Sequence, residues 1–194
     1  MNLDGAYNCA PDSVKKFVDN VIKIEGGYVN NKHDSGGETK YGITKAVARA
    51  HGFSGKMEDL SLGFAQDIYV YDYWIEPKLY LIADVSHLIA EEVFDTGVNS
   101  GTKIAVKILQ RSLNGLNNKQ KYYPDISVDG VMGQNTKKAL SSFLKSRGDK
   151  GETVLFNLLN ILQGAFLFGL SERREKDEEF LYGWLSHRTI FIEK

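Results

Sequence analysis

The segment from Glu25 to Thr44, EGGYVNNKHDSGGETKYGIT, constrains the fold of this chain most, because it has to end a helix and start a turn. The residues before it repeat apolar side chains at the spacing of one helix face. This pattern predicts a helix that runs to about Glu25, with Asp12 or Ser13 as its N-cap. The next two glycines allow the backbone conformations that end a helix. The polar, glycine-rich residues after them predict a tight turn or small hairpin beside the helix end.

Glu25 has an unusual position for a carboxylate. It follows Val21 by four residues and Ile22 by three, so its side chain projects from the apolar face of the predicted helix. Partial desolvation and the negative end of the helix dipole both favour its protonated form. Glu25 is therefore a candidate proton donor for breaking a glycosidic bond, a reaction that also needs a second polar group. The alternative is a helix-terminal glutamate whose head group reaches water.

The motifs EGGY, D-x-G-G-x-T and GIT in this segment resemble the catalytic region of glycoside hydrolase family 108, the phage-type N-acetylmuramidases. The resemblance implies that Glu25 is the catalytic acid. It places the downstream Asp and Thr of the family on Asp34 and Thr39, which we predict to hold and polarise an attacking water and so to give inversion. Glu38 competes for this role if the hairpin register differs by one residue. A water held by hydroxyl and backbone groups alone is the third alternative.

Helical patterns also dominate the rest of the chain. Ser61 and Ser86 are predicted N-caps, and Gly97 and Gly101 are predicted to break a helix around Asn99. The predicted fold class is therefore mainly α, an α+β lysozyme-like helical bundle with a small β-hairpin next to the catalytic helix. We expect a catalytic region at residues 1–98 and a helical peptidoglycan-binding-like region at residues 99–194, with both able to pack into one globule.

The stretch DGVMGQNT in the second half has two interpretations. Its aspartates fit the opening of a calcium-binding loop, but Thr136 occupies the twelfth position, where that loop requires a bidentate glutamate. We therefore exclude calcium. The stretch instead resembles the D-G-x-x-G-x-x-T turn of peptidoglycan-binding modules, here Asp129, Gly130, Gly133 and Thr136. The ending YGWLSHR resembles the G-W-x-x-R ending of the region that commonly accompanies family 108.

Aromatic and polar residues outside the turn complete the predicted site. The helix that starts after Ser61 ends in an aromatic run, and Tyr73 and Trp74 are the rings predicted to line a saccharide cleft. Core packing is the alternative for most rings of this run. The other predicted substrate-binding residues are Tyr28, Thr44 and Asn99.

Composition excludes several classes of function. Cys9 is the only cysteine, and the four histidines are widely spaced outside any zinc motif, so we expect no metal and no cofactor. A zinc amidase is accordingly disfavoured. Acidic residues outnumber basic ones in residues 1–98 and the reverse holds in residues 99–194. This distribution fits either ordinary solvated surfaces or a basic half that helps the protein dock on an anionic bacterial envelope. The basic residues are interleaved with acids, so nucleic acid is not an expected partner.

The N-terminus, MNLDGAYNCAPDSVKK, has neither a basic start nor an apolar run, so we expect no signal peptide. The most apolar stretch, Val154 to Leu170, is interrupted by polar residues and predicts a buried core helix instead of a membrane span. With the resemblance, these features imply a monomeric endolysin made in the host bacterial cytoplasm, which reaches peptidoglycan after a separate factor opens the membrane.

The resemblance also implies the reaction. The bond cleaved would be the β-1,4 bond between N-acetylmuramic acid and N-acetylglucosamine, and its cleavage would lyse the cell. Two alternatives stay open: a lytic transglycosylase, in which a hydroxyl of the substrate replaces water, and a cell-wall-binding protein without activity.

Overall fold

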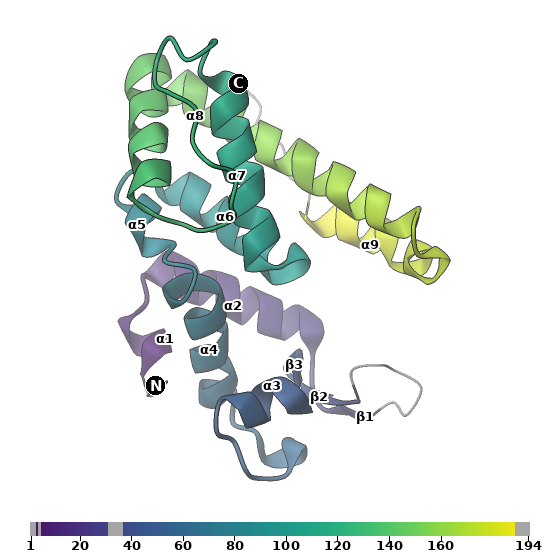
Figure 1. Ribbon diagram of the computed structural model, residues 1–194. Helices are drawn as coiled ribbons and strands as arrows, with labels where there is room; N and C mark the ends of the chain where they lie inside the picture. Colours follow the sequence, from purple (N-terminus) through teal and green to yellow (C-terminus); the bar gives the residue numbers. More distant parts are fainter. Residues whose placement is uncertain (1–2, 4, 31–36, 189–194) are drawn as a thin grey trace. The chain divides into compact units, whose positions relative to one another are not determined.

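The computed structural model describes residue 3, residues 5–30 and residues 37–188, and the chain divides into two compact units, residues 1–76 and 77–194. The described residues are mostly helical, with three short strands in the first unit (Figure 1). The predicted fold class, mainly α with a small hairpin, is confirmed. Residue 98, the predicted domain boundary, lies inside helix α6 (His87–Ser100) of the second unit. The division into a catalytic and a binding region stays a prediction.

The first unit is built on helix α2 (Asp12–Glu25), which ends where the sequence predicts. Gly26 follows with a φ of 77°, and its N–H donates to the carbonyl oxygen of Ile22 to close the last turn. Helix α2 packs against α4 (Leu62–Val70), which starts at the predicted cap, because Ser61 Oγ accepts from the N–H of Phe64. The start of α2 differs from prediction, since Pro11 occupies the cap position without a side-chain hydrogen bond.

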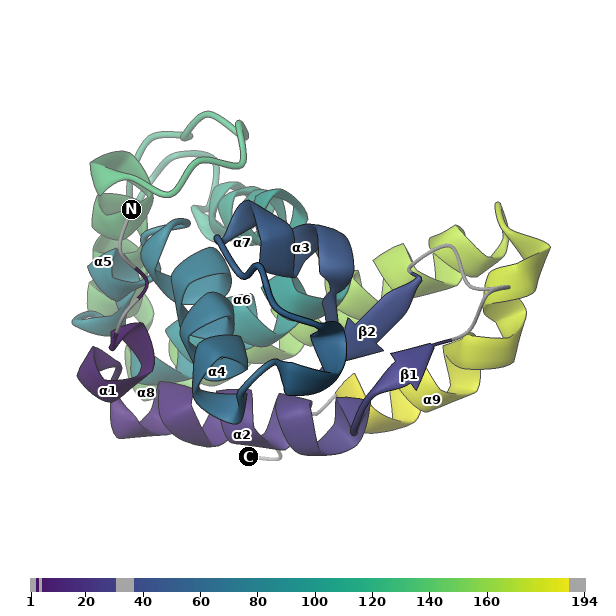
Figure 2. The same cartoon turned by 90° about the horizontal axis from the view of Figure 1, so that it is seen from below.

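Short elements make up the rest of the first unit. They are α1 (Ala6–Cys9), β1 (Val29–Asn30), β2 (Glu38–Lys40), β3 (Ile43–Thr44), α3 (Lys45–Ala50), the 3-10 helix η1 (Met57–Asp59) and the π-helical turn η2 (Tyr71–Ile75). The strands form one antiparallel sheet in the order β1-β2-β3. Figure 2 shows β1 and β2 side by side beyond the C-terminal end of α2.

The second unit is a helical bundle. Its elements are α5 (Tyr80–Ala83), α6, α7 (Thr102–Leu116), α8 (Gln134–Ser171), the 3-10 helix η3 (Glu175–Asp177) and α9 (Glu178–Arg188). Helices α6, α7 and α8 pack pairwise against one another. The predicted cap at Ser86 is confirmed, because its Oγ accepts from the N–H of Ile89. The apolar core of the bundle includes Ile89, Phe94, Leu109, Leu113, Leu140, Phe143 and Leu155.

The prediction that Gly97 breaks a helix is wrong. Gly97 lies inside α6, which continues to Ser100, and the break occurs at Gly101 with a φ of 90°. A Cβ atom added to Gly97 would lie 3.6 Å from Cα of Thr102 and 3.9 Å from Cβ of Ala105. A Cβ atom at this position would therefore be in ordinary van der Waals contact with the first turn of α7.

Helix α8 consists of two parts separated at Gly148. Gly148 has a φ of 62° and a ψ of −159°, which only glycine adopts without strain. By length and composition alone α8 is apolar enough to cross a membrane, yet 33% of its most apolar window is buried. Val154, Ile161 and Phe168 are 40%, 52% and 51% exposed. The predicted core helix is therefore buried on one face and exposed on the other.

Candidate active site

Glu25, the candidate acid, is the last residue of α2. Its backbone therefore lies at the negative end of the helix dipole, as predicted. Its side chain lies outside the described part of the chain, and so does the whole of Asp34. The predicted catalytic pairing of Glu25 with Asp34 stays a prediction.

The predicted hairpin beside the end of α2 is confirmed. Val29 pairs with Thr39 and Asn30 pairs with Glu38, while Thr39 also pairs with Thr44 on β3. Thr39 is thus the middle residue of the central strand. Because successive strand residues point to opposite faces of a sheet, Thr39 and Glu38 face opposite sides. Only one of these two candidates for the second catalytic role can therefore face a cleft on a given side of the sheet.

Glu38 is held by two neighbouring side chains. The hydroxyl of Tyr28 donates to Oε1 at 3.0 Å, and Nζ of Lys45 donates to Oε2 at 2.6 Å. The hydrogen bond from Lys45, followed by the bond from Tyr28, holds the pKa of the Glu38 carboxyl below its usual range. Glu38 is therefore an anion at neutral pH with a donor on each oxygen. This arrangement is poorly suited to proton donation, and it gives Tyr28 a structural contact beside its predicted role with substrate.

Sequence reasoning missed Lys45, although a signal for it exists. Lys45 directly follows Thr44, and Thr44 pairs with Thr39, the neighbour of Glu38 along β2. The pairing of Thr39 with Thr44 brings the start of α3 next to Glu38. The missing information was the length of the connection between β2 and β3, which depends on positive φ values of 55° at Tyr41 and 75° at Gly42.

Three of the predicted substrate-binding residues have structural contacts in the first unit. Thr44 is the N-cap of α3, and its Oγ1 accepts from the N–H of Val47 at 3.2 Å. The half-buried ring of Tyr73 stacks on that of Tyr69, with centroids 5.8 Å apart. Trp74 is 4% exposed and belongs to the core. Tyr73 therefore has more surface available to a sugar than Trp74, and the role of all three in binding stays a prediction.

Asn99, the fifth predicted substrate-binding residue, lies on α6 in the second unit and is half-buried. Its Nδ2 donates to the backbone oxygen of Asp95 at 2.8 Å and to Oδ2 of Asp95 at 3.3 Å. The same Oδ2 accepts from Nε2 of Gln163 on α8 at 3.4 Å. Asp95 therefore orients the Asn99 amide and connects it to α8.

Glu92 on α6 is a buried carboxyl that sequence reasoning missed. It is 6% exposed, and burial, followed by the charge of Asp95, raises the pKa of Glu92 to about 8. Hydrogen bonds with Asn160 and Thr96 act in the opposite direction. The sequence pattern that made Glu25 a candidate also applies to Glu92, because Glu92 follows the apolar Ile89 by three residues on a helix and so lies on the same face. Its enclosure in the bundle gives the protonated group a packing role.

The predicted peptidoglycan-binding turn is bound to α7 through Gln110. Nε2 of Gln110 donates to Oδ1 of Asp129 at 2.9 Å and to Oγ1 of Thr136 at 3.3 Å, while Oε1 accepts from the N–H of Gly130 at 2.9 Å. The backbone bond from Val131 and the Gln110 amide hold the pKa of Asp129 below its usual range. The motif residues therefore fix the shape of the turn. Nothing near them in the sequence indicates Gln110.

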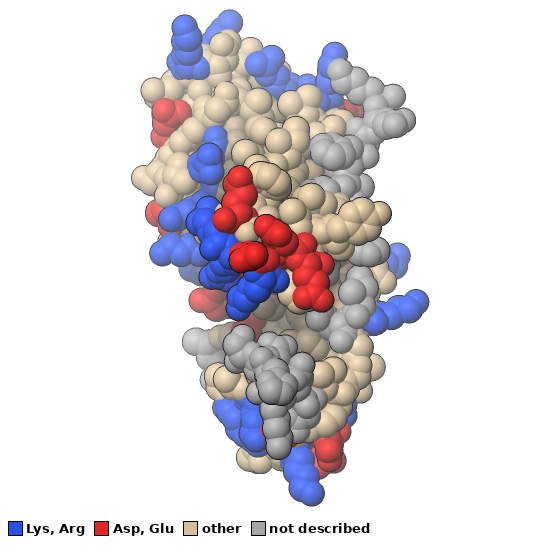
Figure 3. Space-filling view, turned by 90° about the vertical axis from the view of Figure 1, so that its right-hand side faces the viewer, with Lys and Arg blue, Asp and Glu red and all other residues tan. Residues whose placement is uncertain are grey.

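Charged side chains of both signs mix on the surface. In the view of Figure 3 the largest charged group contains Lys or Arg next to Asp or Glu. Docking of a basic half on an anionic envelope stays a prediction. Among the residues that the structure describes, no three His, Cys, Asp or Glu side chains are grouped so that they could hold a metal ion.

Residues 18–101 match the family model Glycosyl hydrolase 108, and residues 104–189 match the model Predicted Peptidoglycan domain. The N-terminal region therefore has the sequence pattern of glycosyl hydrolase family 108. Glu25, Thr39 and Asn99 all lie in the family 108 region, which ends at Gly101, where α6 ends. The turn from Asp129 to Thr136 lies in the predicted peptidoglycan domain. The resemblance is thus confirmed, and the pairing supports a glycoside hydrolase whose polymer is peptidoglycan.

The fold is shared with a solved structure. SagA of Brucella abortus superposes with a TM-score of 0.61 over 93% of this chain and 100% of the SagA chain, at 22% sequence identity. At this identity the likeness shows the fold alone. No curated protein matches the sequence.

Proposed function

We propose that this chain is an N-acetylmuramidase that hydrolyses the β-1,4 bond between N-acetylmuramic acid and N-acetylglucosamine in peptidoglycan. The observation that carries the proposal is the position of Glu25. It ends α2 next to the β1-β2-β3 sheet, inside the region that matches family 108. Its carboxyl group would protonate the leaving glycosidic oxygen.

The second catalytic group we propose is Asp34 assisted by Thr39. An ionised aspartate accepts a proton from water, and a threonine hydroxyl both donates and accepts, so together they would orient the attacking water. Two observations support this choice over Glu38. Thr39 lies on the opposite face of the sheet from Glu38, and both oxygens of Glu38 already accept hydrogen bonds.

Mass spectrometry of purified peptidoglycan after digestion tests the reaction. We expect new reducing ends on N-acetylmuramic acid. Ends in the 1,6-anhydro form would identify a lytic transglycosylase, and free stem peptides would identify an amidase. No new products at all, from a folded protein that binds the polymer, would identify a binding protein without activity.

Replacement of Glu25 tests the proposed acid. Glu25→Gln is expected to fold normally and to lose activity by about 10²–10⁴-fold, because proton donation supplies about this factor. Glu58→Gln is the matched control, since Glu58 is an exposed glutamate of the same unit. Substantial turnover by folded Glu25→Gln protein would overturn the assignment.

We also propose that the protein is an endolysin made in the host cytoplasm and released to the wall by a separate membrane-permeabilising factor. Expression in a bacterial cytoplasm is expected to leave cells intact until a permeabiliser is added. Lysis without a permeabiliser would contradict the route while leaving the reaction unchanged.

A further inference from the structure

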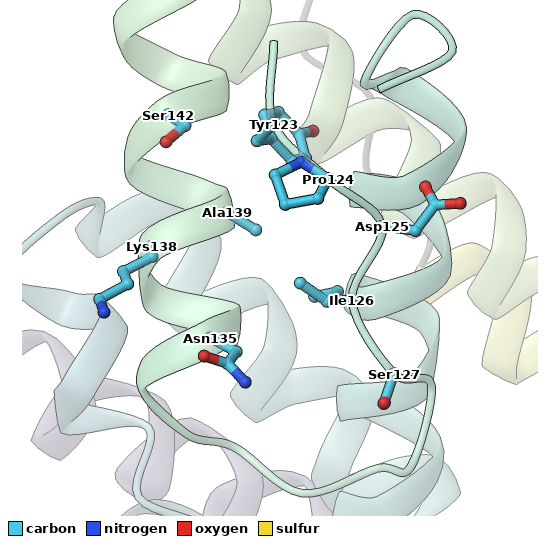
Figure 4. Close-up of a pocket in the computed structure, with 9 residues that line it drawn as sticks. All are labelled: Tyr123, Pro124, Asp125, Ile126, Ser127, Asn135, Lys138, Ala139 and Ser142. Atoms are coloured by element: carbon cyan, nitrogen blue, oxygen red, sulfur yellow. The ribbon is translucent and has the colours of Figure 1, made fainter. Parts of the chain in front are cut away.

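A pocket of about 390 Å³ lies in the second unit between residues 123–127 and the first turns of α8 (Figure 4). On the α8 side it is lined by Asn135, Ala139 and Ser142, which share one helix face because they are spaced by four and three residues. On the other side it is lined by Tyr123, Pro124, Ile126 and Ser127. Its volume is within the range of small-molecule sites.

A second hollow of about 250 Å³ adjoins this pocket. The two share Ile126, Ser127 and Asn135 as lining residues, and the second extends along the turn to Val131 and Gly133. Because they share these lining residues, we treat the two hollows as one site, which we call the loop groove. Two adjoining hollows suit neighbouring units of a linear polymer better than an isolated small molecule.

The loop groove has a rigid wall, because α7 holds the loop by its backbone. Asn114 makes two hydrogen bonds with the backbone of Ile126. Its Nδ2 donates to the carbonyl oxygen of Ile126 at 2.8 Å, and its Oδ1 accepts from the N–H of Ile126 at 2.9 Å. Nδ2 of Asn117 donates to Asp125 at 2.6 Å, and Gln110 holds the adjoining turn. These three α7 side chains are spaced by four and three residues and so lie on one face of the helix. A wall that is already ordered lowers the entropic cost of binding.

The interior of the groove is amphipathic, and the carboxylate of its second hollow, Asp129, already accepts from Gln110 and from the N–H of Val131. Figure 4 shows the side chains of Ala139 and Ile126 pointing toward each other across the gap and the amide of Asn135 pointing into it. The charged groups of Asp125 and Lys138 point away from the gap in the same view. A charged ligand in this gap would therefore lose water without gaining a partner of opposite charge there.

Polar side chains of the groove remain available for a ligand. Within the part of the chain that the structure describes, the side chains of Ser127, Asn135 and Ser142 make no hydrogen bond to protein. By contrast, Asp129 and Thr136 of the adjoining turn each accept a hydrogen bond from Gln110 on α7. The groove thus separates the residues that build it from those free to bind.

We propose that the loop groove binds the uncharged N-acetylated sugars of the glycan strand, not the charged stem peptides. An acetamido group combines a methyl group, which Ile126 and Ala139 would contact, with an N–H and a carbonyl oxygen, which the Asn135 amide would bond. Ser127 and Ser142 would bond sugar hydroxyl groups. The proposal rests on the proposed function only in taking peptidoglycan as the polymer.

Titration of isotope-labelled full-length Glu25→Gln protein, followed by NMR, tests the proposal. Tri-N-acetylchitotriose is expected to shift the amide signals of residues 123–142. Cellotriose, which has the same linkage without acetamido groups, and a synthetic stem peptide are expected to leave these signals unchanged. Asn135→Ala is expected to weaken the sugar affinity at these signals by about tenfold, the value of one good hydrogen bond. Lys138→Ala, on the same helix but directed away from the gap, is the matched control.

Three outcomes would overturn the proposal: shifts at residues 123–142 with the stem peptide but not the sugar, shifts confined to residues 1–76, or equal affinities for Asn135→Ala and Lys138→Ala. These outcomes are separable from a failure of the proposed function. If the protein produces muramic acid reducing ends but the sugar does not shift the signals of residues 123–142, only the groove proposal is contradicted. If the groove binds the sugar but the protein produces no such ends, only the proposed reaction is contradicted.

Discussion

Nζ of Lys45 lies 2.6 Å from Oε2 of Glu38, which joins the start of helix α3 to the central strand of the sheet. The contact compensates the charge of the carboxylate nearest to the predicted catalytic turn. It also lowers the pKa of that carboxylate, so the group is ionised and paired at neutral pH. Glu38 therefore acts as a structural anchor of the sheet, which leaves Asp34 as the expected partner of Glu25.

The first prediction separates Asp34 from Glu38. Asp34→Ala is expected to lower the hydrolysis rate by about 10²–10⁴-fold, as for the loss of a general base. Glu38→Ala is expected to keep activity within about tenfold, because it removes an ion pair and not a proton acceptor. Rates of peptidoglycan solubilisation measure both. The reverse order of effects would assign the second role to Glu38, and two active variants would leave Glu25 acting with a water held by other groups.

The second prediction concerns the pH dependence of stability. The pKa of Glu92 is raised from 4.5 to about 8 in the folded chain, so between these values the folded state holds a proton that the unfolded state releases. The free energy of unfolding therefore falls as pH rises through this window. Glu92→Gln has no carboxyl group to ionise at this position and so lacks this pH-dependent loss of stability. The difference in Tm between Glu92→Gln and the unmodified chain is therefore expected to increase in favour of the variant from pH 5 to pH 8.

The neighbouring Glu91→Gln serves as the control for that experiment, because Glu91 is half-buried on the same helix. Its Tm difference is expected to stay constant across the same pH range. Parallel behaviour of the two variants would contradict the account of Glu92. Activity of Glu92→Gln is expected to stay near that of the unmodified chain, because the carboxyl group is enclosed in the bundle.

The third prediction compares the two glycines of the D-G-x-x-G turn. Gly130 has a φ of 77°, and a Cβ atom there would lie 2.8 Å from the carbonyl oxygen of Lys103. Gly130→Ala is therefore expected to lower the free energy of unfolding by about 1–3 kcal/mol. Gly133 has an extended backbone with open space around it, so Gly133→Ala is expected to cost less than about 1 kcal/mol. Chemical denaturation followed by circular dichroism measures both, and equal losses would contradict the distinction.

The fourth prediction concerns the exposed face of α8. Residues 149–171 would span about 34 Å as a helix, enough for a bilayer core of about 30 Å. Asn160 and Gln163 are nonetheless fully buried, and Gln163 bonds to Asp95. Insertion would break these contacts, so the protein is expected to stay out of lipid vesicles in a flotation experiment. Flotation that is abolished by Ile161→Asp would show that the exposed face enters the bilayer.

Local sequence signals predicted the framework of the fold. Ser61 and Ser86 are helix caps because their hydroxyl groups accept from the N–H three residues later, an interaction that depends on neighbours in the chain alone. The end of α2 at Glu25 and the sheet after it follow from glycine and apolar periodicity in the same way. The fold class required nothing beyond these short-range patterns.

Features that depend on residues far apart in the sequence could not be predicted. Gly97 signals a helix break by composition, but α6 continues through it and packs there against α7. Gln110 on α7 stabilises a turn about twenty residues away. The catalytic assignment came from a motif, and the geometry of its second group stays a prediction.

The arrangement around Gln110 also has a consequence for how binding preference could diversify. The residues of the recognisable turn are occupied by bonds to α7, so their replacement would alter the scaffold. The side chains at positions 127, 135 and 142 make no such bonds, and each is exposed or half-buried. A protein built this way can acquire affinity for a different wall polymer by exchanging those three side chains, while the motif that identifies the module stays intact.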